Sequence, residues 1–399
     1  MESLRELFKI GNGPSSSHTM GPKRAAEQFK ERCGEADSYR VTLYGSLAAT
    51  GKGHLTDVAI LSVLEPKAPT EIVWKADVVL PFHPNGMLFE GLKGGEVIDS
   101  WQIFSVGGGA LANEETKDAP KINIYPFTTI EEIKAYCQRE GKTYWEYVED
   151  CEGADIWDFL DNVWTVMCDT IQRGLNNDGV LPGGLKVARK ASNYYVKSQS
   201  YAGSLASRAR IYAYALAVAE ENASGGEVVT APTCGSCGVI PATIYHLATS
   251  RNFTRIRILR ALATAGLFGN VVKTNSSISG AEVGCQGEIG VACAMAAAAA
   301  CQLFGGTPSQ IEYAAEMGLE HHLGLTCDPV CGLVQVPCIE RNAIAAARAL
   351  DANTYATLSD GQHLVAFDKV VAVMKETGLD MPSLYRETSE GGLAKRYHE

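Results

Sequence analysis

The chain has 399 residues, of which 46% are hydrophobic and 20% charged, so it can bury an ordinary core and is neither disordered nor of low complexity. Its net charge of −11 disfavours nucleic acid and anionic membranes as general partners. No apolar run reaches the roughly 18–20 residues of a membrane span, and the charged N-terminus lacks a signal-peptide core. We therefore expect a cytoplasmic protein with no membrane or nucleic-acid partner, in which the twelve cysteines form no disulfide framework.

The first part of the chain mixes strand and helix patterns. Residues 11–22 hold two Gly/Pro clusters around a run of hydroxyl side chains and one histidine, which predicts a loop, and a helix is predicted over 23–32. Residues 39–44 alternate and 70–80 are rich in β-branched residues, which predicts strands around a helix at 58–64. With a turn at 107–109 and a further strand at 122–125, we interpret residues 1–140 as an α+β domain.

From residue 128 onwards the apolar period becomes helical and stays so. Helices are predicted over 128–140, 144–149, 156–173, 257–267, 289–303, 311–319 and 341–350, and the last four are rich in alanine. Loops rich in Gly, Pro, Ser and Cys interrupt them at 223–238, 273–288 and 323–338. We expect residues 150–399 to form an all-helical catalytic domain, and alanine-rich helices that also pack between subunits to make a homodimer.

The cysteines fall into two groups. Those within helix-like patterns are interpreted as small buried side chains: Cys33, Cys137, Cys151, Cys168, Cys293 and Cys301. The others lie in glycine-rich loops: Cys234, Cys237, Cys285, Cys327, Cys331 and Cys338. Cys285 precedes a predicted helix, where free N–H groups favour a thiolate. Spacing alone leaves three alternatives open, namely a four-thiolate zinc site, an iron–sulfur cluster and no metal at all.

Several blocks rich in Gly, Ser and Cys follow one another along the chain. They are residues 13–22 (GPSSSHTMGP), 50–57 (TGKGHLTD), 83–87 (HPNGM), 105–109 (SVGGG), 277–288 (SISGAEVGCQGE), 323–329 (LGLTCDP) and 334–342 (VQVPCIERN). In these blocks and their order the sequence resembles the bacterial iron–sulfur L-serine dehydratases, or L-serine ammonia-lyases. The resemblance runs from the N-terminus to residues 391–394.

The resemblance implies a β-type and an α-type domain fused in one chain, and a carbon–oxygen lyase that converts L-serine to pyruvate and ammonia in amino-acid degradation and gluconeogenesis. It also implies a [4Fe–4S] cluster held by Cys285, Cys327 and Cys338, which makes Cys331 a bystander. The chain departs from the pattern at Cys234, where many members have asparagine. It also ends in Glu399, where some members have a cysteine that caps the fourth iron, so we expect Glu399 or water at that position.

An iron with an open coordination position acts as a Lewis acid on the hydroxyl and carboxylate of serine, and a base must then take the Cα proton. Histidine is the side chain with a pKa near neutrality, so we expect His54 to be the base, with His18 as the second candidate and Thr56 beside them. His18 is preferred as a contact of the substrate carboxylate, and the other residues expected to bind the substrate are Ser15, Ser16, Ser17, Thr19, His83 and Asn85. These hydroxyls also suit helix capping, and His54 also suits a purely structural turn.

Three other functions are weighed against this one. A related cluster-dependent L-cysteine desulfidase would use the same iron for a thiol. A pyridoxal-phosphate lyase would need a Schiff-base lysine, for which Lys52 is the candidate. A protein in which a metal serves only to hold the fold would leave the Ser- and His-containing loops without a role.

Overall fold

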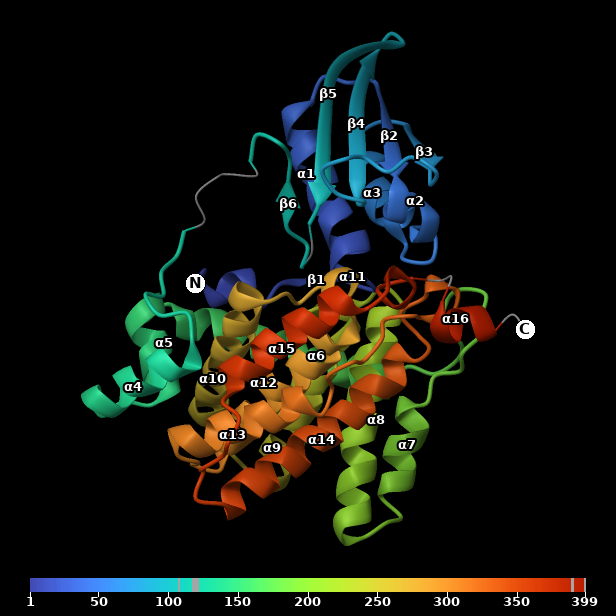
Figure 1. Cartoon of the computed structure of the whole chain (residues 1–399). Helices are drawn as coiled ribbons and strands as arrows, with labels where there is room; N and C mark the ends of the chain where they lie inside the picture. Colours follow the sequence, from blue (N-terminus) through green and yellow to red (C-terminus); the bar gives the residue numbers. More distant parts are fainter. Residues whose placement is uncertain (107, 117–121, 389–390, 398–399) are drawn as a thin grey trace.

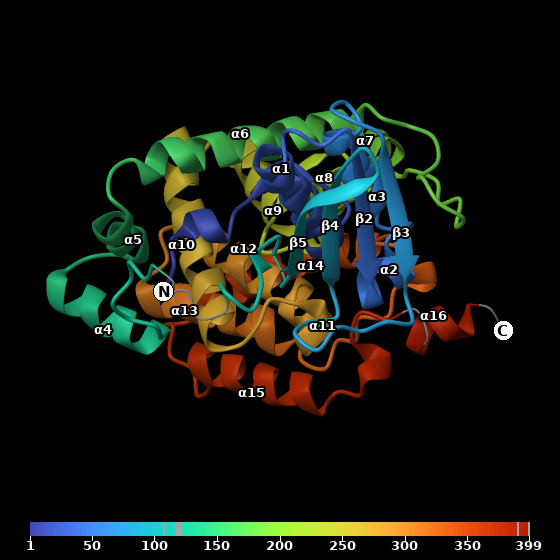
Figure 2. The same cartoon turned by 90° about the horizontal axis from the view of Figure 1, so that it is seen from above.

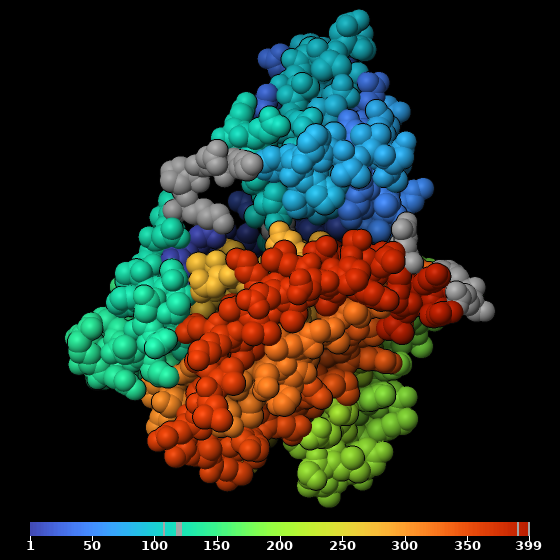
Figure 3. Space-filling view, viewed as in Figure 1, coloured from blue at the N-terminus to red at the C-terminus, as the bar shows by residue number. Residues whose placement is uncertain are grey.

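A computed structural model of the protein describes residues 1–106, 108–116, 122–388 and 391–397. An α+β unit stands on a larger helical body (Figure 1). The predicted fold class, an α+β region followed by an all-helical one, is confirmed. In space-filling view, the α+β unit lies directly against the C-terminal segments of the helical body (Figure 3).

The α+β unit is built on one five-stranded sheet. Its strands are β2 (Ser38–Tyr44), β3 (Thr70–Lys75), β4 (Gly86–Lys93), β5 (Glu96–Ser105) and β6 (Leu111–Ala112), and its helices are α1 (Gly21–Arg32), α2 (Gly45–Thr50) and α3 (Thr56–Leu64). The strand order is β3-β2-β4-β5-β6, with β2 and β3 parallel and the other pairs antiparallel. The parallel pair requires a crossover, which α2 and α3 provide. Phe29 of α1 and Ile60 of α3 pack against Val41 and Phe89 of the sheet, so these helices cover one face (Figure 2).

The predicted strand at 122–125 is wrong, because these residues have no partner strand. Ile122 is exposed, and the backbone N–H groups of Ile124 and Tyr125 donate to the carbonyl of Met1. Residues 122–125 instead form an extended connection that is hydrogen-bonded to Met1. The predicted strand at 70–80 ends earlier, at Lys75.

The first twelve residues belong to the helical body. The short helix η1 (Leu4–Glu6) and strand β1 (Ile10–Asn12) precede the α+β unit, and β1 pairs antiparallel with β7 (Glu227–Val229). Leu4, Leu7 and Phe8 are buried in the helical core. The chain therefore starts in the helical body, leaves it to form the α+β unit, and returns by Tyr125, which is buried in the same core.

The helical body surrounds one central helix. Its helices are α4 (Ile130–Glu140), α5 (Tyr144–Glu152), α6 (Ile156–Leu175), α7 (Ala191–Ser198), α8 (Gly203–Ala223), α9 (Val239–Arg251), α10 (Arg255–Asn275), α11 (Gly280–Val283), α12 (Ile289–Leu303), α13 (Pro308–Glu320), α14 (Cys338–Leu358), α15 (Phe367–Asp380) and α16 (Gly392–Arg396). Short turns of helix are η2 (Ser16–Met20), η3 (Cys234–Ser236), η4 (Cys285–Gly287), η5 (Val330–Gly332) and η6 (Ser383–Tyr385).

Helix α12 is the central one, and α9, α10, α13 and α14 pack around it. All of its residues except Gln302 are buried, which is typical of a helix that is apolar on every face. Its alanines are therefore used inside the subunit and are not available for packing between subunits. Among the described residues, no helix combines the length and the apolar character that crossing a membrane requires.

Candidate functional site

A pocket lies where the α+β unit meets the helical body. The N-terminal segments contribute Pro14, Ser15, Ser16, Ser17 and His54 to its lining. The helical body contributes chiefly Thr233, Gly280, Glu288, Cys327, Cys338 and Glu387. The pocket thus brings together residues that are more than three hundred positions apart in the sequence, and neither unit forms it alone.

Three cysteine thiols from different segments meet beside this pocket: Cys327 and Cys338 line it, and Cys285 is not among the lining residues but contacts Cys327. Cys285 lies on η4, Cys327 precedes η5, and Cys338 is the first residue of α14. The thiols of Cys285 and Cys327 are in hydrogen-bonding contact, and Cys338 is close enough to Cys285 to raise its own pKa electrostatically. Gly280 leaves the necessary room, because a Cβ at that position would lie 3.0 Å from the Cys327 sulfur.

The pKa values of the three thiols are shifted in different directions. The pKa of Cys285 is lowered, chiefly by the hydrogen bond with Cys327 and further by the guanidinium of Arg341. The pKa of Cys327 is raised by that same hydrogen bond and by burial, and burial raises that of Cys338. The predicted thiolate character of Cys285 therefore has a side-chain cause, rather than the free N–H groups of a helix.

The donor set suits an iron–sulfur cluster. Cysteine thiolates are the ligands that such clusters use, and Arg341 supplies a positive charge beside all three sulfurs. Within the described ranges, no three His, Cys, Asp or Glu side chains surround a single metal-ion position. A cluster binds each cysteine through a different iron, so it does not require its ligands to meet around one point.

His54 and His18 form a buried pair beside the thiols. Their ring centroids are 4.6 Å apart, and His54 lines the pocket. Burial lowers the pKa of His54 to about 4, and that of His18 well below its usual value, so both rings are neutral at pH 7. Both ring nitrogens of His18 have partners, with Nδ1 2.9 Å from Ser17 Oγ and Nε2 3.0 Å from Ser46 Oγ. Among the described residues, the ring of His54 has Thr50 as its hydrogen-bonding partner, with Nδ1 3.2 Å from Oγ1.

Two threonines tie the histidine segments together. The Thr19 hydroxyl donates to the carbonyl of His54 at 2.7 Å, and the Thr56 hydroxyl donates to the carbonyl of His18 at 2.6 Å. These reciprocal bonds fix the position of one histidine relative to the other. Neither threonine is among the residues that line the pocket.

Ser15, Ser16 and Ser17, here called the serine loop, line the pocket at the start of η2. Ser15 Oγ accepts from the backbone N–H of His18 at 3.1 Å and lies 3.3 Å from Ser17 Oγ. The Asn222 side chain, on α8, donates to the carbonyl of Pro14 at 3.0 Å and so attaches the loop to the helical body. Ser15 therefore both caps η2 and lines the pocket, together with Ser16 and Ser17.

His83 and Asn85 lie outside this lining. The backbone N–H of Asn85 donates to His83 Nδ1 at 3.1 Å, and the Asn85 side chain donates to the carbonyl of Ser105 at 3.2 Å. Among the predicted site residues, the structure thus gathers the three serines, His54 and the three cysteines, whereas His83 and Asn85 form a neighbouring turn.

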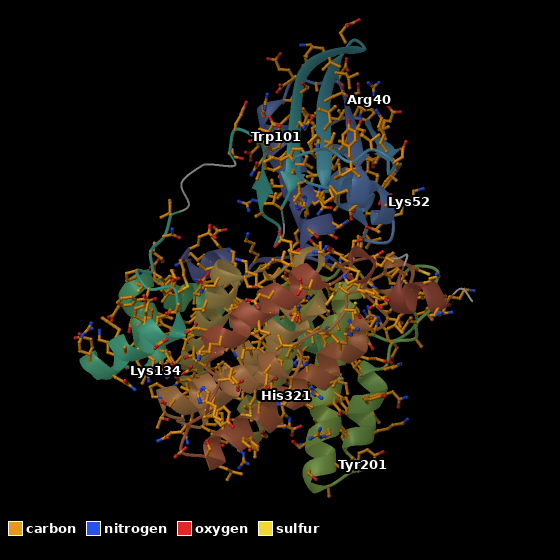
Figure 4. The ribbon with its side chains drawn as sticks, in the orientation of Figure 1. Arg40, Lys52, Trp101, Lys134, Tyr201 and His321 are labelled. Atoms are coloured by element: carbon orange, nitrogen blue, oxygen red, sulfur yellow. The ribbon has the colours of Figure 1, made fainter. Side chains whose placement is uncertain are left out.

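Lys52 is exposed, although it lies in the same block as His54. Its ammonium group is 5.6 Å from the centre of the Trp74 ring, and it projects outward from the α+β unit (Figure 4). A Schiff-base lysine requires a desolvated amine that faces the substrate. The position of Lys52 therefore does not support the pyridoxal-phosphate alternative.

Of the remaining loop cysteines, Cys234 and Cys237 are buried and Cys331 is exposed. The Cys234 sulfur lies 3.9 Å from that of Met20, while its neighbours Thr233 and Gly235 line the pocket. Glu399, the residue predicted at the fourth iron, lies outside the described residues, as does Gly107 of the predicted turn at 107–109.

The sequence predictions missed Glu288, Glu387 and Arg341. Two of them had a signal: Glu288 follows Cys285 by three residues, and Arg341 follows Cys338 by three, which is one turn of α14. Glu387 had none, because it reaches the pocket only through the fold of the C-terminal segment. Burial raises its pKa to about 8, and the nearby Glu288 carboxylate adds to the effect.

An α+β unit fused to a helical body, with three thiols and a histidine at their junction, defines a two-part enzyme fold with a cysteine-based site. Comparison with known proteins gives the family. Residues 3–75 match the family described as serine dehydratase beta chain, and residues 96–394 match serine dehydratase alpha chain. The chain belongs to the serine dehydratase family, with both parts in one polypeptide.

Curated relatives match over nearly their whole length. The L-serine dehydratase of Streptomyces coelicolor is 42% identical over 447 aligned residues, with 98% of each chain covered. L-serine dehydratase 2 of Escherichia coli is 40% identical with 99% of each covered, and the L-serine dehydratase of Helicobacter pylori is 38% identical with 98% of each covered. The alignments are longer than this chain because the relatives contain segments that it lacks.

Proposed function

We propose that the protein is an L-serine ammonia-lyase that uses a [4Fe–4S] cluster held by Cys285, Cys327 and Cys338. The observation that carries the proposal is that Cys327, Cys338 and a neutral His54 line one pocket, with the Cys285 thiol in contact with that of Cys327, in a chain whose relatives are named L-serine dehydratases. When bound, a cluster with an open coordination position supplies Lewis acidity for the leaving hydroxyl of the substrate.

His54 is the proposed base. A neutral imidazole has a free lone pair, and the one ring contact of His54 leaves Nε2 available to take the Cα proton. His18 has both ring nitrogens engaged, so its proposed role is to support His54, with Thr19 and Thr56 fixing the pair. The Ser15, Ser16 and Ser17 hydroxyls bind the substrate carboxylate, and His83 with Asn85 shapes the adjoining turn.

The reaction balances as an elimination. The Cα–H bond breaks and its proton passes to His54, while the Cβ–O bond breaks and the hydroxyl leaves as hydroxide, which takes up that proton and departs as water. The product, 2-aminoacrylate, tautomerises to an imine, and water hydrolyses it to pyruvate and ammonia. No oxidant or reductant is consumed.

The test compares two cysteine variants after anaerobic cluster reconstitution. The wild type is expected to show broad visible absorbance and to release pyruvate from L-serine, with both lost in air. Cys285→Ala should lose both, because removal of a ligand leaves too few thiolates to retain the iron. Cys331→Ala, which changes an exposed thiol outside the pocket, should retain both.

The measurements are iron and sulfide content, the absorbance spectrum and pyruvate release. A Cys285→Ala protein with full iron content and full activity would contradict the proposed ligand set. Faster turnover of L-cysteine than of L-serine by the wild type would contradict the proposed substrate.

A further inference from the structure

Two carboxylates lie on the helical-body wall of the pocket, facing the segments that carry the serines and His54. They belong to Glu288 and Glu387, and they are the only acidic side chains among the residues that line the pocket. Glu288 Oε1 accepts from the Thr233 hydroxyl at 2.6 Å, and Oε2 lies 3.9 Å from the Cys327 sulfur. Burial raises the pKa of Glu288, and the positive charge of Arg341 offsets part of that effect, although no lysine or arginine is among the residues that line the pocket.

The backbone places Glu387 beside the Cys327 thiol. The N–H of Cys327 donates to the carbonyl of Tyr385 at 2.7 Å, and the N–H of Thr388 donates to the carbonyl of Cys327 at 3.2 Å. Glu387 lies between these two bonds, with φ of 50°, a left-handed conformation that is unfavourable for a residue with a Cβ. The segment therefore holds this side chain at the pocket at a conformational cost.

The pocket is also shaped around Glu288. A Cβ at Gly280 would lie 2.9 Å from Glu288 Oε2, and a Cβ at Gly235 would lie 3.2 Å from Oε1. Contacts this short require a neighbour to shift, so both glycines leave space that the carboxylate occupies. A cation bound between the two carboxyl groups would favour the ionised form of both.

L-serine, the substrate of the proposed function, carries one charge of each sign. The serine-loop hydroxyls provide hydrogen-bond donors for its carboxylate. Its α-ammonium group has three N–H donors and a positive charge, so it needs acceptors and preferably anions. Only the wall with Glu288 and Glu387 offers carboxylates to meet it.

Building on the proposed function, we propose that Glu288 and Glu387 bind the α-ammonium group of the substrate and thereby select amino acids over hydroxy acids that lack it. The two residues are specificity determinants. The carboxylate of the substrate is held from the N-terminal side of the pocket and the ammonium group from the helical side, which orients Cα toward His54.

The test compares L-serine with 3-hydroxypropionate, which retains the carboxylate and the β-hydroxyl and lacks only the amine. Enzyme with its cluster is used, in the wild type and in the isosteric variants Glu288→Gln and Glu387→Gln. Each variant should raise the KM for L-serine about tenfold or more, the usual loss for a charge-assisted hydrogen bond. The inhibition constant of 3-hydroxypropionate should stay within about twofold, and iron content and absorbance should be unchanged.

Glu282→Gln is the matched control, because it removes the same charge from an exposed position in the same segment and should change neither constant. The ammonium site would be overturned if Glu288→Gln and Glu387→Gln changed the KM for L-serine and the inhibition constant of 3-hydroxypropionate equally, or changed neither. A wild-type enzyme that binds 3-hydroxypropionate as tightly as L-serine would also overturn it, a comparison that does not depend on the folding of any variant.

Failure of the proposed function would be seen separately, as absence of pyruvate from L-serine with the wild type. L-serine would then not be consumed, and its binding could be measured by calorimetry against the same variants. The ammonium site would still be supported or overturned by that comparison.

Discussion

At the scale of single residues, the two histidines of the serine-dehydratase blocks differ in environment more than in sequence. Both lie beside hydroxyl residues in glycine-containing loops, and the sequence pattern ranks them only by their neighbours. The structure distinguishes them by their contacts, since His18 is engaged at both ring nitrogens and His54 at one. Motifs thus predict that a histidine is at the site, and burial and hydrogen bonding decide which role it can perform.

His54→Ala should retain the visible absorbance and iron content of the wild type, because His54 is not among the proposed ligands. Its kcat should fall by about 10²–10⁴-fold, the usual contribution of a positioned base. Steady-state pyruvate release measures the effect. The control is His321→Ala, which changes an exposed histidine outside the junction pocket (Figure 4). Near-normal turnover by His54→Ala would assign the base to another residue.

The residues that could not be predicted are those whose position depends on the tertiary fold. Cys285, Cys327 and Cys338 stand in glycine- and proline-containing loops, and only the family resemblance selected them from the six loop cysteines. Glu387 has no such context. It reaches the pocket because residues 385–388 form backbone hydrogen bonds with Cys327, 58 to 61 positions earlier in the chain.

At the scale of elements, long runs of helix-favouring residues predicted the structure best. The alanine-rich segment 289–303 forms α12 with those bounds, since alanine favours helix and the flanking loops end it. Patterns at the edge of the sheet predicted less well: the strand expected at 70–80 stops at Lys75, and that at 122–125 is absent. Strand formation requires a partner, which local sequence does not specify.

Packing on α12 gives a prediction for α13. Gly318 of α13 lies against the backbone of α12, where a Cβ would be 2.8 Å from Cα and 2.9 Å from N of Ala294. Helix propensity alone favours alanine over glycine by about 1 kcal/mol, but separating two packed backbones costs more. We expect Gly318→Ala to lower the free energy of unfolding by about 1–3 kcal/mol in urea titrations.

Gly34→Ala provides the comparison, because a Cβ there meets open space. It should leave stability unchanged or raise it by about 0.4–1 kcal/mol through the unfolded chain. Equal stability of Gly318→Ala and the wild type would show that α12 and α13 are free to separate at this point.

At the scale of the whole molecule, buried ionisable groups act on stability in opposite directions. Burial lowers the pKa values of His54, His246 and His322 to about 4. Burial also raises the pKa of Glu316 to about 7 and that of Glu387 to about 8. As pH falls from 8 to 4, the unfolded chain binds protons at the histidines that the folded chain does not, which lowers the free energy of unfolding. Over the same range the folded chain binds protons at the two buried acids before the unfolded chain does, which raises it. The contribution of one group is therefore best measured by comparing the unfolding free energy of the wild type with that of a variant that lacks the group.

His246 suits that measurement, because it lies outside the pocket with Nε2 2.8 Å from Ser207 Oγ. Its folded pKa is about 4 and its unfolded value about 6.5, so its contribution is present above pH 6.5 and is lost as pH falls toward 4. Between pH 7 and pH 5, the wild type should lose about 2 kcal/mol more unfolding free energy than His246→Asn. Urea titrations at both pH values measure this, and an equal loss in the two proteins would mean that His246 is protonated in the fold.

The pairing of β1 with β7 has a consequence for how the protein is made. The N–H of Lys9 donates to the Thr230 hydroxyl across 221 positions of sequence. At roughly 5–20 residues per second, a ribosome needs on the order of 10–45 seconds to reach that partner. During this interval the apolar Leu4, Leu7 and Phe8 have no core to enter, while the α+β unit that follows them can already fold. This segment is therefore synthesised well before the helices that it packs against, and a chaperone that shields nascent apolar segments would find its target there.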